Sequence, residues 1–268
     1  LRRHTQGMTL ATHATTPQTI TASAVTLIPG YFTAPVPPTP LVFNAQHDAC
    51  PTATVTLIRF ADDIGRAVGY DREQGGRLIQ DIFPVRSNEL AQVSTSSKVV
   101  LGSHTETAFH PHKPRYVVLL CLRSDPQAAT TYADVADIVV HLSDENLAVL
   151  QINEFVTSVD PSFMSNGEPD VQVRVTPLTA TDEGWSLIYD QLLMRGTTPR
   201  AIAALSALHH AVKHTTQQVV LAAGDILVID NHRCVHGRTP FAPRYDGTDR
   251  WLKRALVVES LNGIDAIE

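Results

Sequence analysis

The chain has 268 residues, of which 43% are apolar, and its formal charge is -6 with no long run of Lys or Arg. This length and composition suit one large domain with a sizeable core, and the charge argues against nucleic acid or an anionic membrane as a partner. No apolar stretch approaches the roughly 18 residues that span a bilayer. The polar start does not resemble a secretory signal, and an odd number of widely spaced cysteines predicts reduced thiols in a cytoplasmic protein: Cys50, Cys121 and Cys234.

The N-terminal quarter is rich in Thr, Ala and Pro, and residues 34–40 read "APVPPTP". Such a composition disfavours a long helix. The stretch could be a disordered arm, but the apolar groups in "VTLIPGYF" and "PLVF" favour an extended segment on the surface of the domain. We therefore divide the chain into an extended segment over 1–52, with 1–7 as an extension before a native start at Met8, and a domain over 53–268.

Strand patterns dominate the rest of the chain, after a weakly helical stretch, "FADDIGRAVGYD". The run "RYVVLLCLR" is apolar throughout and predicts a strand that is buried on both faces. The predicted strands lie at 76–85, 97–103, 115–123 and 171–178, with two joined at Ala-Gly-Asp within 217–241 and a final one in "RWLKRALVVESL". Helices are expected on either side of Ser143, which caps the second, and over 197–215. This order predicts a mainly β fold with flanking helices and a double-stranded β-helix core, the jelly roll of cupin-like proteins.

A polar stretch after the second of these strands, "LGSHTETAFHPH", holds three histidines and a glutamate. His104 and Glu106 are two residues apart, so on a strand their side chains would point the same way. His236 follows the buried strand "DILVIDN", where a turn is expected. Two histidines and one carboxylate can occupy one face of an octahedral ion, which is the iron(II) site of non-haem oxygenases. The alternative is a polar turn, because a chain with twelve histidines produces such triplets by chance.

Longer motifs carry a resemblance to a known family. The stretches "HTETAFHPHKPRYVVLLCLRSD", "AATTYADV" and "GDILVIDNHRCVHGRTPFAPRYDGTDRWLKR" resemble the clavaminate synthase-like branch of iron(II)/2-oxoglutarate oxygenases, in particular the enzymes that β-hydroxylate free asparagine or arginine. The likeness covers about residues 74–258. It implies that iron is bound by His104, Glu106 and His236. It also implies that Arg250 and Thr130 bind 2-oxoglutarate, the cosubstrate consumed with O2.

The same resemblance implies residues for an amino-acid substrate. Arg254 would bind the α-carboxylate, Gln74 would lie near the amino-acid head, and Asp190 would accept from a nitrogen of the side chain. Glu106 could also face the ammonium group. A guanidinium is a natural two-pronged partner of a carboxylate. Arg250 and Arg254 are four residues apart, so both point to the same face of a strand and could bind two carboxylates.

Two positions depart from the family pattern. Ile188 stands where an arginine-specific enzyme carries a second acid, and Ser103 stands where an aromatic residue often precedes the His-x-Glu triplet. A single acid argues against a guanidinium-bearing substrate without establishing asparagine. The loop 159–170 is expected to act as a lid that keeps water from the reaction.

The predicted function is hydroxylation, at Cβ, of a free L-amino acid or close derivative with a nitrogen-bearing side chain, in specialised-metabolite biosynthesis. Desaturation, epoxidation or cyclisation on the same scaffold remain alternatives. Two other classes are a metal-dependent hydrolase or isomerase on a cupin-like barrel, which has no use for Arg250, and a non-catalytic barrel that binds a small molecule.

Overall fold

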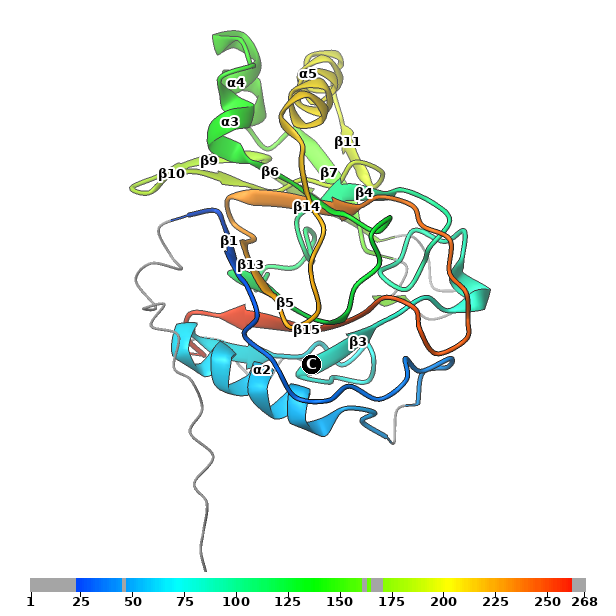
Figure 1. Ribbon diagram of the computed structural model, residues 1–268. Coiled ribbons are helices and arrows are strands. Elements are labelled where there is room, and N and C mark those ends of the chain that lie inside the picture. Colours follow the sequence, from blue (N-terminus) through cyan, green and yellow to red (C-terminus); the bar gives the residue numbers. More distant parts are fainter. Residues whose placement is uncertain (1–22, 45–46, 161–162, 165–170, 262–268) are drawn as a thin grey trace, which may run out of the picture.

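The computed structural model describes residues 23–44, 47–160, 163–164 and 171–261 (Figure 1). These residues form a mainly β protein in which every strand pairing is antiparallel. None of the described helices is long and apolar enough to cross a membrane.

The major sheet has the strand order β1-β13-β5-β15-β2, and β3 also pairs with β15. Its central strands are apolar along most of their length, and all eight residues of β15 are buried. Both faces of the sheet are covered, as the continuous apolar run of β5 predicts. The strands are β1 (Val25–Ile28), β2 (Arg66–Val68), β3 (Ile79–Ile82), β5 (Tyr116–Arg123), β13 (Ile226–Asp230) and β15 (Trp251–Val258).

Helix α2 (Pro51–Ile64) covers the outer face of the major sheet (Figure 1). Its buried residues include Leu57 and Phe60, which pack in one apolar cluster with Leu120 and Trp251. Pro51 opens the helix at a position where the missing N–H group has no intrahelical partner to lose.

A second sheet, which we call the minor sheet, has the order β12-β6-β14-β4. It lies between the major sheet and the remaining helices (Figure 1). His236 on β14 stands directly opposite His104 on β4. The strands are β4 (Leu101–His104), β6 (Thr130–Asp134), β12 (Gln217–Val219) and β14 (Cys234–Arg238).

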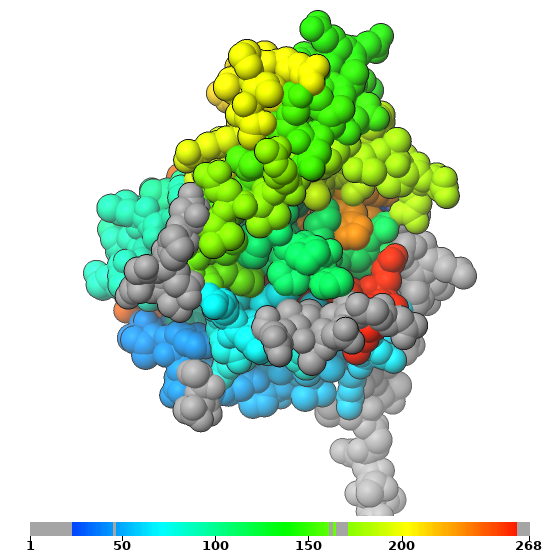
Figure 2. Space-filling model, turned by 180° about the vertical axis from the view of Figure 1, so that it is seen from behind, coloured from blue at the N-terminus to red at the C-terminus, as the bar shows by residue number. Residues whose placement is uncertain are grey.

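Helices α3 (Val135–Val139), α4 (Asp144–Leu150) and α5 (Pro199–Thr215) gather at the end of the molecule opposite to α2, as the reverse view also shows (Figure 2). Ser143 and Thr198 cap α4 and α5 by accepting hydrogen bonds from the N–H groups of Asn146 and Ala201. The remaining elements are a short 3-10 helix (Arg86–Asn88), the hairpin β9 (Leu178–Thr181) and β10 (Gly184–Leu187), and the three-stranded sheet of β7 (Phe155–Ser158), β8 (Gln172–Val175) and β11 (Met194–Gly196).

The N-terminal part differs from the expected surface segment. Strand β1 pairs with β13 at one edge of the major sheet, and Ala24, Ile28 and Phe32 are buried. Helix α2 starts at Pro51, so the expected boundary after residue 52 falls inside a helix. The Thr-rich composition concealed this helix, because its stability comes from the apolar face that packs on the sheet. The expected extension over 1–7 lies outside the described residues.

The region 217–241 was predicted to hold two strands, whereas the structure has three. The sequence of β14, Cys234–Arg238, is short and mixes apolar with charged residues, so it does not read as a strand. His236 therefore lies in the middle of a strand and not at the turn that was expected.

Candidate active site

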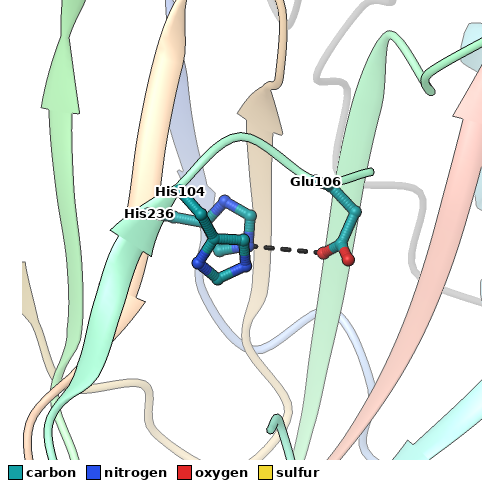
Figure 3. Close-up of side chains that lie close together, drawn as sticks. All are labelled: His104, Glu106 and His236. Carbon is teal, nitrogen blue, oxygen red and sulfur yellow. Dashed lines mark ion pairs between the residues drawn. The ribbon is translucent and has the colours of Figure 1, made fainter. Parts of the chain in front are cut away.

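Two histidines and one glutamate lie close together between the major and the minor sheet (Figure 3). The rings of His104 and His236 lie with their centroids 4.5 Å apart. The Oε2 atom of Glu106 is 3.5 Å from Nε2 of His236. One ligand atom from each of the three side chains lies within 4.8 Å of the other two. The residues expected to bind iron thus face one point.

A close approach of β4 to β14 brings the two histidines together. A Cβ atom on Gly237 would lie 2.5 Å from the carbonyl oxygen of Leu101 and 3.0 Å from Oγ1 of Thr131. Only glycine fits between the strands at this position. The residue after the ligand His236 is therefore set by packing.

Glu106 reaches the site from a position that the sequence did not predict. Strand β4 ends at His104, and the chain turns at Thr107, whose φ is 50°. Glu106 therefore does not share a strand with His104, and the predicted strand alternation is wrong for this residue, although its carboxylate does face the two rings (Figure 3).

The electrostatics of the cluster suit a metal ion. Burial raises the pKa of Glu106, but the charge of Arg254 and the adjacent His236 outweigh it and hold this pKa well below its usual range. Burial, together with the charge of His104, lowers the pKa of His236. An ionised carboxylate and neutral imidazole are the forms that bind metals. Two imidazoles and one carboxylate on one side of an open cavity fit iron(II) by ligand type and number.

Arg250, just before β15, offers a positive charge at one end of the same cavity. Its side chain is 6% exposed, and Nη2 donates to Oγ1 of Thr130 over 3.4 Å. Burial lowers the pKa of Arg250 to about 10. Within the described part of the chain, no carboxylate forms an ion pair with it. A buried guanidinium without an anionic partner indicates a site for an anion.

Arg238 lies beside this end of the cavity. Its guanidinium donates to the backbone carbonyl groups of Ser94, Ser96 and Val99. Burial and the charge of Arg250 lower the pKa of Arg238 to about 10. The two buried cations give this end of the cavity a positive potential that favours a dianion.

Arg254 occupies the other end and already has anionic partners. Nη1 donates to Oε2 of Glu106 over 2.9 Å, and Nε donates to Oε1 of Gln80 over 2.8 Å. Nη2 forms an ion pair with Glu73. Burial raises the pKa of Glu73, and the negative charge of Glu106 raises it further, whereas the positive charge of Arg254 lowers it only in part.

Sequence reasoning missed Glu73 and Gln80. Gln80 lies opposite Arg254 on the neighbouring strand β3, and this register cannot be read from the sequence. Glu73 precedes Gln74 in "REQGG", so a signal was present one residue away. Gln74 itself lies in a turn with φ of 47° and is not among the residues that line the cavity; its Nε2 donates to the carbonyl of Asp81.

Asp190 lines the cavity and pairs with His104 in an isolated β-bridge. Its Oδ1 accepts hydrogen bonds from the N–H groups of Leu192 and Leu193, at 2.8 and 2.7 Å. One carboxylate oxygen is thus used to shape the turn that follows. The second oxygen is the one that a ligand could use.

The cavity has a volume of about 310 Å³. Besides the polar groups above, apolar side chains line it, among them Phe109, Leu119, Leu192 and Leu252. Asp160 and Phe163, from the expected lid, also line it; residues 161–162 and 165–170 of that loop lie outside the described part. Ile188 is half-buried and does not line the cavity.

The two histidines, the glutamate and the buried arginines indicate an iron(II)/2-oxoglutarate oxygenase site. The family match agrees with this: residues 40–256 match the family described as "Taurine catabolism dioxygenase TauD, TfdA family". The chain belongs to this family. The resemblance to the clavaminate synthase-like oxygenases is thereby confirmed: the chain is 34% identical to clavaminate synthase 2 of Streptomyces clavuligerus over 203 residues, which cover 75% of this chain and 62% of that protein.

Two other relatives are similar to the chain. The L-lysine 3-hydroxylase of Catenulispora acidiphila is 35% identical over 231 residues, which cover 83% of this chain and 63% of that protein. The crystal structure of asparagine oxygenase with Fe(II), 2S,3S-3-hydroxyasparagine and succinate is 35% identical, with a TM-score of 0.81 over 92% of this chain and 77% of that one. The chain therefore spans just under two thirds of the lysine hydroxylase and of clavaminate synthase 2.

Proposed function

We propose that the protein is an iron(II)- and 2-oxoglutarate-dependent oxygenase that hydroxylates a free L-amino acid, or a close derivative, with a nitrogen-bearing side chain. The observation that carries the proposal is the convergence of His104, Glu106 and His236 in one cavity with the buried guanidinium of Arg250, which forms no ion pair with any of the described residues. A metal-dependent hydrolase or isomerase would have no use for that guanidinium. The lysine 3-hydroxylase and the complex with 3-hydroxyasparagine support Cβ as the position of hydroxylation.

In this proposal the three side chains hold iron(II), and Arg250 and Thr130 hold the C5 carboxylate of 2-oxoglutarate. Bound iron supplies the reaction of O2 with 2-oxoglutarate, which yields succinate and CO2 and inserts one oxygen atom into a C–H bond of the substrate. The protein orients both organic molecules. Apolar residues such as Leu119 and Leu252 line the same cavity and would keep water from the reaction.

The amino-acid head group would bind at the opposite end. Arg254 would hold the α-carboxylate, and the ammonium group would lie near the carboxylates of Glu106 and Glu73. Gln74 remains a proposed contributor next to Glu73 in the chain, although its side chain does not line the cavity and donates to the carbonyl of Asp81. The second oxygen of Asp190 would accept a hydrogen bond from the nitrogen of the substrate side chain.

Three further proposals concern the chain as a whole. The major and minor sheets would form the two halves of a double-stranded β-helix, with the site between them. The loop 159–170 would act as the lid, which Asp160 and Phe163 at the cavity wall support. The buried, unbridged cysteines support a role in the cytoplasm, and relatives such as clavaminate synthase 2 support one in specialised-metabolite biosynthesis.

The test is a turnover experiment on anaerobically purified protein. The protein is given iron(II), 2-oxoglutarate and O2, together with each of a panel of free L-amino acids that includes asparagine, lysine, ornithine, arginine and leucine. We expect one or a few nitrogen-bearing amino acids to stimulate succinate formation and to gain the mass of one oxygen atom. A product that has instead lost two hydrogen atoms would identify desaturation or cyclisation. Failure of every amino acid to raise succinate formation above the background would refute the proposed substrate class.

A further inference from the structure

The backbone of the candidate ligand Glu106 lacks the support that β-strands give to His104 and His236. Strand β4 ends two residues before Glu106. The next residue, Thr107, has a φ of 50°, a conformation that a β-branched residue seldom adopts. The carboxylate can be aimed reliably only if another group fixes the chain at this turn.

One side chain does so. Oδ1 of Asn231 accepts a hydrogen bond from the N–H of Glu106 over 2.6 Å, and Nδ2 donates to the carbonyl of the same residue over 3.1 Å. Nδ2 also donates to the carbonyl of Pro114 over 3.0 Å. Asn231 is fully buried and follows directly after β13. Its amide thus gives Glu106 the pair of hydrogen bonds that a neighbouring strand would give.

We propose that Asn231 is a positioning residue for the metal ligand Glu106, an inference that rests on the proposed iron site. Asn231 fixes the backbone of Glu106, and Arg254 holds its carboxylate over 2.9 Å. The ligand is therefore held at both ends before a metal arrives. Because Arg254 is also the proposed partner of the substrate, the backbone clamp is the part that stays unchanged when the substrate binds.

The chemistry of the clamp requires an amide of this length. Aspartate at position 231 could accept from the N–H of Glu106, but its second oxygen would face the carbonyl groups of Glu106 and Pro114 without a hydrogen to donate. Leucine has a similar size and offers neither group. Loss of groups that orient a metal ligand typically weakens metal binding by roughly 10- to 100-fold.

The experiment measures metal binding directly, with Co(II) as a spectroscopic substitute for iron(II) under anaerobic conditions. Asn231→Leu and Asn231→Asp are titrated alongside the wild type, and the visible absorption of bound Co(II) reports the ligand geometry. We expect both variants to bind Co(II) at least about tenfold more weakly, with an altered spectrum.

Asp225→Leu is the matched control, because it removes a buried clamp at the other end of the same strand. The Asp225 carboxylate accepts from the N–H groups of Gly30 and Ala222, at 3.0 and 2.9 Å. This control should lose thermal stability but keep the wild-type Co(II) affinity and spectrum. Wild-type affinity in either Asn231 variant, or an equal loss of affinity in Asp225→Leu, would overturn the positioning role.

Glu106→Ala separates this proposal from the proposed function. If Glu106→Ala abolishes the Co(II) spectrum while the Asn231 variants keep it, the metal site stands and only the role of Asn231 fails. If the wild type itself gives no Co(II) spectrum that depends on Glu106, then both proposals fail.

Discussion

Replacement of Arg250 by alanine tests the cosubstrate site most directly. This guanidinium is buried and donates a hydrogen bond to Oγ1 of Thr130, and no ion pair within the described structure neutralises it. We expect Arg250→Ala to raise the KM for 2-oxoglutarate while kcat at saturating 2-oxoglutarate falls much less. The reason is that the C5 carboxylate lies far from the bond that reacts, so the clamp contributes to binding.

The magnitude follows from the burial of the charge. Burial lowers the pKa of Arg250 from 12.5 to about 10. Since one pKa unit corresponds to about 1.4 kcal/mol, burial disfavours the charged guanidinium by roughly 3 kcal/mol. An anion that binds there recovers part of this cost and adds charged hydrogen bonds, each of about 1.5 to 3 kcal/mol. Arg238 remains nearby in the variant, so we expect a KM higher by about 10- to 100-fold.

The assay is succinate formation at a fixed, saturating concentration of the amino acid found in the panel, with 2-oxoglutarate varied. Arg250→Lys keeps a charge but loses the planar fork, so its KM should lie between those of the wild type and Arg250→Ala. Arg244→Ala removes a half-exposed arginine from the same loop and serves as the control. A KM for 2-oxoglutarate within twofold of the wild type in Arg250→Ala would show that the anion binds elsewhere.

Three further predictions test other parts of the site. Asp190→Asn keeps an Oδ1 that can accept from the N–H of Leu192, but it replaces the other oxygen by an NH2 donor. Turnover of the preferred amino acid should therefore fall, and amino acids whose side chains carry an acceptor should be better tolerated. Equal turnover by both proteins would exclude Asp190 from substrate recognition. Glu73→Gln should raise the KM for the amino acid by about tenfold, as expected for a lost charged hydrogen bond, and leave the KM for 2-oxoglutarate unchanged. An equal rise in both KM values would contradict the assignment of the two molecules to opposite ends of the cavity. Burial and the nearby Lys113 charge lower the pKa of His232 to about 4, so the unfolded chain takes up the proton first as pH falls from 6.5 to 4. Between pH 6.5 and 4 the free energy of unfolding should therefore drop by up to roughly 3 kcal/mol more in the wild type than in His232→Gln. Urea denaturation at each pH measures this, and an equal dependence of the unfolding free energy on pH in both proteins would refute the assignment.

The sequence predicted those elements whose patterns are local. The apolar run of β5, the cap at Ser143 and the Thr-Pro start of α5 each lie within a few residues, and each element formed where it was expected. Strand β14 was missed, and helix α2 was expected only at its C-terminal end, within "FADDIGRAVGYD", because both elements depend on the surfaces against which they pack. The mainly β character of the fold was predicted for the same local reasons.

The site was less accessible to sequence reasoning, because its contacts join distant parts of the chain. The facing positions of His104 and His236 depend on the register of β4 with β14, and the partners of Arg254 depend on the register of β15 with β3. Motif resemblance supplied the residue types for the metal and the cosubstrate. It pointed to Gln74, next to Glu73, but assigned no role to Glu73 or Asn231, whose roles follow from contacts between segments.

The distribution of charge along one strand explains how two similar anions could be kept apart. Arg250 and Arg254 both line the cavity, one just before β15 and one on it. Arg254 is already paired with two carboxylates, whereas Arg250 forms no ion pair with any of the residues that the structure describes. A dianion such as 2-oxoglutarate is therefore attracted to the end of the cavity at Arg250, where the positive charge is not balanced by an ion pair within the described structure. A zwitterionic amino acid suits the opposite end, where its ammonium group can face the acids as its carboxylate meets the guanidinium. On the other face of β15, Lys253 is held by Asp48 and Asp81, so the strand that presents both guanidiniums is itself anchored from behind.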